Sequence, residues 1–179
     1  MHNRIYIIKQ LNKFTKFSTR LNFLNAHVIG KLNYMLPLYM HASKDLTQKL
    51  HKVVMTAARA AIGNYCFKKL TSYILEKCKW LNIKNMILHS SLKVLHKIIT
   101  CKEPDAIVNL YKNINTKRAV VNAIPKYKPK SKYYKIFFIY QTLNIYYNLP
   151  KSIRDSTVSM FKTLTKDYLA KNDVYDTFD

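Results

Sequence analysis

Glycine, acidic residues and paired cysteines are all scarce in this sequence, and each shortage excludes a class of site. Among 179 residues the glycines are Gly30 and Gly63 alone, too few for a glycine-rich loop that cradles phosphates. The three cysteines form no C-x-x-C pair, which argues against both a disulfide scaffold and a zinc knuckle. We therefore expect free thiols in a reducing compartment.

The nine Asp and Glu residues are scattered along the chain and suggest no catalytic centre. Two-metal phosphoryl transfer needs carboxylates that converge on ions about 3.5–4 Å apart. We interpret His89 and His96, seven residues apart on one expected helix, as ordinary, partly exposed histidines. The residues therefore predict no enzyme activity, metal or cofactor. A nuclease that uses the acidic tail residues Asp173, Asp176 and Asp179 is the remaining enzymatic hypothesis.

No segment approaches the roughly 20 apolar residues that a membrane-spanning helix needs. The first residues, MHNRIYIIKQLNKF, contain neither an uninterrupted apolar core nor a small-residue cleavage site. We expect an intracellular protein, nuclear or cytoplasmic, that is soluble and not secreted. We expect no membrane partner.

Positive charge dominates the composition. Lys and Arg number 31 against nine acidic residues, which gives a formal net charge of +22. A polyanion is needed to neutralise such a chain, so nucleic acid is the expected partner. A compositional explanation stays open, because Lys, Asn, Ile, Tyr and Phe are the residues that A/T-rich codons supply.

The charge is densest between Ala106 and Arg154, where eight lysines occur without an acidic residue. Tyrosines are interleaved with these lysines, and rings beside cations can stack on bases while the cations hold phosphates. The alternative is that the tyrosines belong to a core and the lysines are simply solvated. The candidate nucleic-acid-binding residues of this segment are Arg118, Lys126, Lys128, Lys130, Lys132 and Lys135.

Apolar residues recur at helical spacing over most of the chain, which predicts a mainly α fold. Ser43 is placed to begin a helix that Gly63 ends, and a second strong helix is expected over residues 84–100. The first of these helices has a basic outer face of Lys49, Lys52 and Arg59, which we also predict to contact nucleic acid. Its expected inward residues are Leu46, Leu50, Val53, Val54, Ala57 and Ala61. An earlier helix, which Pro37 is expected to kink or end, carries Leu21, Leu24, Val28, Leu32 and Met35 along one face. The residues expected to be buried in the helix over 84–100 are Met86, Ile87, Val94, Leu95, Ile98 and Ile99.

The pattern predicts two regions. Residues 1–115 form a helical bundle, and residues 116–179 form a basic extended or short-hairpin segment followed by a terminal helix. Pro150 is expected to turn the chain so that this helix packs Met160, Phe161 and Leu164 on the core. Arg154 is expected to contact either acidic or helix-terminal groups or nucleic acid.

Three ordered stretches carry a family resemblance. The stretch YQTLNIYYNLPKSIRDSTVSMFKTLTKDYL resembles the closing segment of reverse transcriptases of non-LTR (LINE-like) retrotransposons. Two earlier stretches, LNAHVIGKLNYMLPLYMHASKDLTQKLHKVVMTAARAAIG and LEKCKWLNIKNMILHSSLKVLHKIIT, are similar to segments of the same family in the same order. The chain departs from the family pattern at Tyr39, Met40 and Tyr147, where Trp-Gly and Trp are usual. The matched residues are Tyr34, Leu50, Ala57, Ala58, Arg59, Gly63, Trp80, Leu81, Ile83, Lys97, Ile98, Asn148, Leu149, Pro150, Ile153 and Arg154, and Phe161, Lys162, Leu164, Lys166 and Leu169 approximate the end of the closing segment.

The resemblance implies that the chain corresponds to the thumb and C-terminal region of an RNA-directed DNA polymerase. The family's palm, with its paired catalytic aspartates, and its endonuclease domain have no counterpart in the sequence. A thumb grips the template and primer duplex, so the implied partners are RNA, DNA or their hybrid, bound without sequence preference. A polymerase palm is a further implied partner. The alternative is a structural module that packs on a separate palm, with a charge that reflects codon usage.

Overall fold

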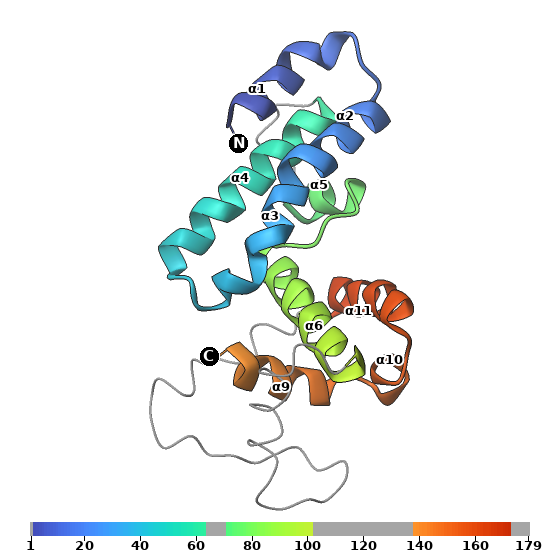
Figure 1. The fold of residues 1–179 in the computed structure, drawn as a ribbon. Helices are drawn as coiled ribbons and strands as arrows, with labels where there is room; N and C mark the ends of the chain where they lie inside the picture. The colour runs from blue at the N-terminus through green and yellow to red at the C-terminus, as the bar shows by residue number, and fades with distance from the viewer. Residues whose placement is uncertain (1, 64–70, 102–137, 173–179) are drawn as a thin grey trace, which may run out of the picture. The chain divides into compact units, whose positions relative to one another are not determined.

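The computed structural model describes residues 2–63, 71–101 and 138–172, and these residues form helices and turns without a strand (Figure 1). The mainly α fold class is therefore confirmed. The expected extended or hairpin segment and the expected boundary near residue 115 both lie outside the described residues. Contacts divide the chain into two compact units, with described residues up to Ile87 in the first and Leu88–Asn172 in the second.

The first unit is built around one long helix, α4, which packs against α1, α2 and α5 (Figure 1). The last helix of the unit, α6, begins here and continues into the second unit. The elements are α1 (His2–Gln10), η1 (Leu11–Lys13), α2 (Phe17–Leu24), η2 (Asn25–Ile29), α3 (Gly30–Met35), η3 (Leu36–His41), α4 (Lys44–Ile62), α5 (Thr71–Lys77) and α6 (Ile83–Cys101).

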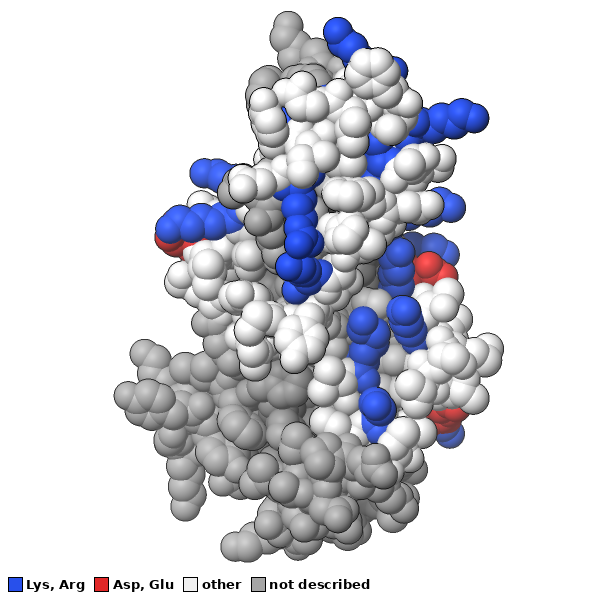
Figure 2. Space-filling view, turned by 45° about the horizontal axis from the view of Figure 1, so that its top comes forward, with Lys and Arg blue, Asp and Glu red and all other residues white. Residues whose placement is uncertain are grey.

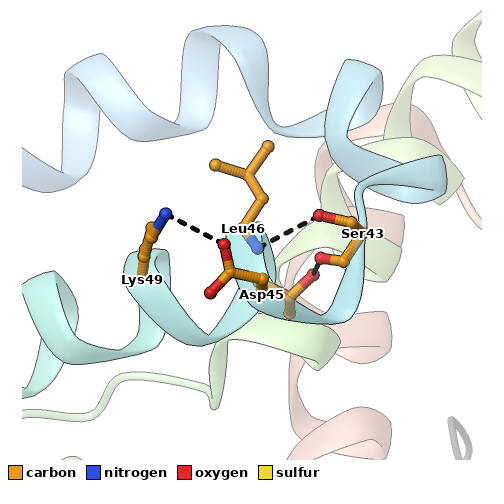
Figure 3. Close-up of polar contacts among 5 residues, drawn as sticks. Ser43, Asp45, Leu46 and Lys49 are labelled. Carbon is orange, nitrogen blue, oxygen red and sulfur yellow. Dashed lines mark hydrogen bonds and ion pairs between the residues drawn. The ribbon is translucent and has the colours of Figure 1, made fainter.

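Local interactions define both ends of α4, as the sequence predicts. The Ser43 side chain accepts a hydrogen bond from the Leu46 backbone N–H at 3.3 Å (Figure 3), and Gly63 ends the helix in the left-handed conformation with φ 75°. Val54 and the alanines of α4 are fully buried. The inward position predicted for Leu46 is wrong: this side chain is exposed because it lies in the first turn, at the edge of the apolar stripe.

The helix predicted to end before Pro37 is not uniform. A π-helical segment, η2, separates α2 from α3, and a 3₁₀ segment with Pro37 in its first turn follows α3. Leu24, Val28 and Leu32 form the buried stripe, whereas Met35 is exposed. Because a π turn adds a residue to the helical repeat, the apolar stripe shifts around the helix at η2.

A buried arginine joins three segments of the first unit. The Arg20 Nε–H donates to the Ala61 carbonyl at 2.8 Å, and its Nη1 donates to the carbonyls of Asn12, at 3.0 Å, and Thr15. The Asn12 side-chain amide in turn donates to the Gly63 carbonyl at 3.2 Å. The Arg20 Nε–H and the Asn12 amide thus satisfy the carbonyls of Ala61 and Gly63 at the C-terminus of α4, where a cation is also favoured by the helix dipole.

Trp80 and Cys78 are buried in the core of the first unit. The Trp80 indole N–H donates to the Asn25 side-chain oxygen at 2.8 Å, at the start of the π-helical segment. The Cys78 thiol is buried near the Ala58 carbonyl, and this burial raises its pKa to about 11. Cys78 is thus a protonated, unreactive thiol, and Cys78 and Cys101 are both free.

The second unit has a neutral histidine at its centre. His96 of α6 is 2% exposed, and its ring stacks on Phe161 with centroids 3.9 Å apart. Its Nε2 lies 3.1 Å from the Ser156 carbonyl and its Nδ1 lies 3.0 Å from the Tyr146 hydroxyl. Since a carbonyl only accepts, Nε2 carries the hydrogen and Nδ1 accepts from Tyr146. The other elements are α9 (Phe138–Asn148), α10 (Lys151–Arg154) and α11 (Val158–Lys171).

The Leu-Pro turn is confirmed, but the predicted inward face of the terminal helix is partly wrong. The α9 helix ends at Asn148, and Pro150 precedes α10. Phe161 is buried as predicted, whereas Met160 and Leu164 are 58% and 36% exposed. The buried stripe of α11 instead follows strict four-residue spacing, Phe161, Thr165 and Leu169. Val94 of α6 was also predicted to be buried, but its side chain is 41% exposed. In both helices the buried stripe is narrower than the apolar spacing suggests.

We predict that Arg20→Met destabilises the first unit by about 2–4 kcal/mol, because buried carbonyls lose a charged donor. Urea unfolding followed by Trp80 fluorescence measures this loss, since Trp80 is the only tryptophan and lies in the same unit. Arg4→Met is the matched control. Arg4 donates to the His27 carbonyl at 3.1 Å near the surface, so its loss should cost about 0.5 kcal/mol. Equal losses in the two variants would contradict the central role of Arg20.

Candidate nucleic-acid interface

The basic face predicted on α4 is present at the surface. Lys49 and Lys52 are exposed, and Arg59 is half-buried two turns further along the helix. Helical geometry places the three residues within about a quarter of a turn of one another. The Lys49 ammonium lies 2.9 Å from the Asp45 carboxylate (Figure 3), so its charge is partly offset by an exposed ion pair that contributes little stability.

The other predicted contact residues lie outside the described residues. They are Arg118, Lys126, Lys128, Lys130, Lys132 and Lys135. Their role therefore stays a prediction from the sequence, and the structure brings together only the three residues on α4.

A second group of cations lies within the second unit, and the sequence analysis did not identify it. We call His89 and Lys93 of α6, together with Lys162 and Lys166 of α11, the basic cluster. Each pair is spaced four residues apart, which places its members on one face of their helix. The His89 Nε2 lies 3.0 Å from the Lys162 carbonyl, so a hydrogen bond joins the two helices at the cluster.

Mutual repulsion is the main electrostatic property of the basic cluster. Burial, together with the charges of Lys93, Lys166 and Lys162, lowers the pKa of His89 to about 4, against the opposing effect of the hydrogen bond to the Lys162 carbonyl. Burial and the charge of Lys162 also lower the pKa of Lys93. The charged groups that act on these two residues are all lysines. Within the described part of the chain, the cluster therefore brings positive charges together without an acidic group acting on His89 or Lys93.

Figure 2 shows one face of the molecule coloured by charge. Lysine and arginine side chains are spread over the visible face of the described residues, and acidic side chains are few. Among pairs in which both partners are described, the ion pair between Lys49 and Asp45 is the only one found. The surface therefore offers many cations to an external anion.

Arg154 makes a contact that the sequence analysis did not consider, and its expected contacts with acidic or helix-terminal groups or with nucleic acid stay predictions. Its guanidinium lies over the Tyr147 ring, 5.9 Å from the ring centre, in a cation–π contact. The side chain is half-buried, and the Tyr146 hydroxyl lies 3.5 Å from the Arg154 carbonyl. Tyr146 is buried in the core of this unit, which supports the interpretation of that tyrosine as structural.

The sequence contains a local signal for each of the two pairs in the basic cluster. Lys162 and Lys166 are spaced by four on a predicted helix, as are His89 and Lys93, and such ladders are visible without a structure. Nothing in the sequence indicated that the two ladders would face one another, because they are separated by the whole basic segment. His96 was expected to be partly exposed, and its full burial likewise follows from contacts with distant residues.

Neither a metal-binding group nor a membrane span is found in the part of the chain that the structure describes. Its His, Cys, Asp and Glu side chains form no cluster of three or more that would hold an ion. Its helices are too short or too polar to cross a bilayer. The candidate site is thus defined by cations and by the helices that carry them.

We predict that the second unit loses stability as the pH falls from about 6.5 towards 4. The folded pKa of His89, about 4, lies below its unfolded value of 6.5, so the unfolded chain binds more protons in this window. Stability is complete above pH 6.5, and up to about 3 kcal/mol is lost at the lower end. His96, whose pKa burial also lowers, contributes in the same direction.

Thermal unfolding measured by circular dichroism at several pH values tests this prediction. His89→Gln should flatten the dependence on pH between 6.5 and 4. The control is His27→Gln, because His27 is exposed in the first unit. An unchanged pH dependence in His89→Gln would show that His89 is not held neutral by the fold.

Comparison of the chain with protein-family models, with curated proteins and with solved structures gives no match. The resemblance to non-LTR retrotransposon reverse transcriptases therefore depends on the three quoted stretches alone. Within those stretches the structure gives Trp80, Gly63 and Pro150 structural roles, in a core contact, a helix end and a turn.

Proposed function

We propose that this chain binds nucleic acid through backbone phosphates, as the C-terminal, thumb-like region of a reverse transcriptase of the non-LTR retrotransposon type. In this proposal it grips template and primer and does not itself add nucleotides. The observation that carries the proposal is the excess of surface cations over acidic groups on both units, in a chain of net charge +22. The motif resemblance supplies the polymerase context.

Phosphate contacts explain both the number and the type of these residues. Lys52, Lys162 and Lys166 are exposed lysines on helix faces, and lysine presents a compact charge that suits a phosphate oxygen. Such contacts provide affinity by releasing condensed counterions and carry little sequence information. A thumb that must follow a moving duplex needs this kind of binding.

Codon usage alone explains the number of lysines better than it explains their positions. It has no preference for where lysines lie on the folded surface, whereas the basic cluster gathers like charges on two helices. A like-charged pair four residues apart on a helix costs about 0.2–0.5 kcal/mol. Lys93 and Lys162 also repel one another across the two helices. A negatively charged ligand would relieve this repulsion between the lysines, and that relief would favour binding.

We predict salt-dependent binding of a short RNA/DNA hybrid. If four or more phosphates are neutralised, the association constant should fall by about tenfold or more for each doubling of the salt concentration. Fluorescence anisotropy of a labelled hybrid measures this slope. Two hybrids of unrelated sequence should bind equally well, because backbone contacts do not read bases.

Two variants of α4 complete this test. Lys52→Gln removes an exposed charge from the predicted face and should lower the slope by about 1 if the residue contacts a phosphate. Gln48→Ala changes an exposed neutral residue of the same helix and should leave the slope unchanged. Affinity that does not change between low and high salt would contradict the proposed function.

A second function, packing on a separate polymerase palm, is favoured by exposed apolar side chains in the first unit. Tyr34, at a position of the matched motif, is 87% exposed, and Leu38 and Phe14 are 73% and 83% exposed. Such side chains are candidates for contact with another domain. The occupant in this hypothesis is the catalytic palm that the resemblance implies.

Limited proteolysis of the chain with and without an added palm domain tests the second function. We predict slower cleavage when the palm is present, and loss of that protection in the double variant Tyr34→Ser/Leu38→Ser. Met160→Ser, which changes an exposed apolar residue of the second unit, is the control. Identical cleavage with and without the palm would remove this hypothesis.

A further inference from the structure

We propose that the basic cluster is a discrete phosphate-binding site, in which a phosphate of the nucleic-acid backbone lies between α6 and α11. The inference rests on the proposed function and adds the place and the residues of one contact. The site consists of His89, Lys93, Lys162 and Lys166, and it lies entirely within the second unit.

The geometry of the site is fixed by the fold. The hydrogen bond from the His89 Nε2–H to the Lys162 carbonyl, at 3.0 Å, joins the two helices at the point where their basic residues meet. One turn separates His89 from Lys93, and one turn separates Lys162 from Lys166, a rise of about 6 Å in each helix. A neutral histidine with one lysine on α6 and two lysines on α11 therefore lie near the hydrogen bond that joins the two helices.

Among the residues that the structure describes, no acidic side chain forms an ion pair with the lysines of the site. Asp155, which precedes α11, and Asp167, on α11, are the acidic residues nearest in sequence to Lys162 and Lys166, and both are exposed. Neither forms an ion pair with a described lysine or contributes to the shifts of His89 and Lys93. The excess of positive charge among the described residues of the site is the property that favours an anion as its ligand.

Lys93 distinguishes this site from an ordinary solvated face. It is half-buried, so its charge has lost part of its hydration while facing the charge of Lys162. A desolvated ammonium gains more from a phosphate oxygen than a fully hydrated one does, because charge-assisted hydrogen bonds strengthen where water is excluded. Lys162 and Lys166, which are exposed, are positioned to contact the same or the next phosphate.

His89 gives the site a signature that can be measured. Its Nε2–H is already used by the Lys162 carbonyl, so the neutral ring offers only a lone pair on Nδ1. Protonation would add a second donor and a positive charge, and a bound phosphate favours both. Binding of a phosphate should therefore raise the pKa of His89 from its value of about 4 in the free protein.

The first experiment measures binding of the labelled RNA/DNA hybrid to the full chain as a function of salt. Lys162→Gln/Lys166→Gln should lower the magnitude of the salt slope by about 1–2, because one or two phosphate contacts are lost. Lys151→Gln/Lys171→Gln is the matched control, since it removes two exposed lysines of the same unit that do not act on His89. The control should remain closer to the unmodified chain.

The outcomes separate the site from the function. Strong binding with equal slopes in the two double variants would overturn the site and leave the proposed function intact. A larger loss in Lys162→Gln/Lys166→Gln than in the control supports the site. Because both variants change only exposed residues, unfolding is not expected, and circular dichroism of each variant verifies this.

The second experiment follows the His89 imidazole by NMR during a pH titration, with and without inorganic pyrophosphate. A higher pKa in the presence of pyrophosphate, absent in Lys162→Gln/Lys166→Gln, supports the site even if the hybrid itself fails to bind. An unchanged His89 titration in the presence of pyrophosphate overturns it. Vesicles with anionic lipid serve as a third ligand, and binding to vesicles without binding to the hybrid would overturn the nucleic-acid assignment.

Discussion

The first unit depends on the buried guanidinium of Arg20. The last carbonyls of a helix have no partner within the helix, and at the end of α4 they lie inside the protein. Arg20 supplies donors to Ala61, Asn12 and Thr15, and thereby ties η1 and α2 to α4. In a chain with so few acidic residues, a buried arginine is satisfied by backbone carbonyls in place of a carboxylate.

The second unit has an uncharged polar side chain at its centre in place of a buried cation. Its polar centre is His96, which burial keeps neutral and which is held by Tyr146, Ser156 and the ring of Phe161. A neutral ring adds hydrogen bonds to the core without adding to the net charge of +22. The remaining cations are left at the surface, where Lys162 and Lys166 are available to a phosphate.

Much of the fold follows from local features of the sequence, such as helix caps, prolines and apolar spacing. As predicted, α4 begins after Ser43 and ends before Gly63, α3 ends before Pro37, and Pro150 separates α9 from α10. Apolar spacing gives the direction of a buried stripe but not its width, so residues at its edge were assigned wrongly. The positions predicted to be buried and found exposed are Leu46, Val94, Met35, Met160 and Leu164. For the candidate site, the exposed lysines of α4 were predicted from the sequence, whereas the basic cluster was not.

The amino-acid sequence by itself determined the net charge, the helical class and the positions where helices begin and end. These properties are local, because a cap or a helical turn involves residues within about four positions of one another. Only the tertiary structure decided which carbonyls Arg20 would reach and that Lys93 would meet Lys162. Those contacts join residues far apart in the chain, and they depend on how whole helices pack, which no short stretch of sequence specifies.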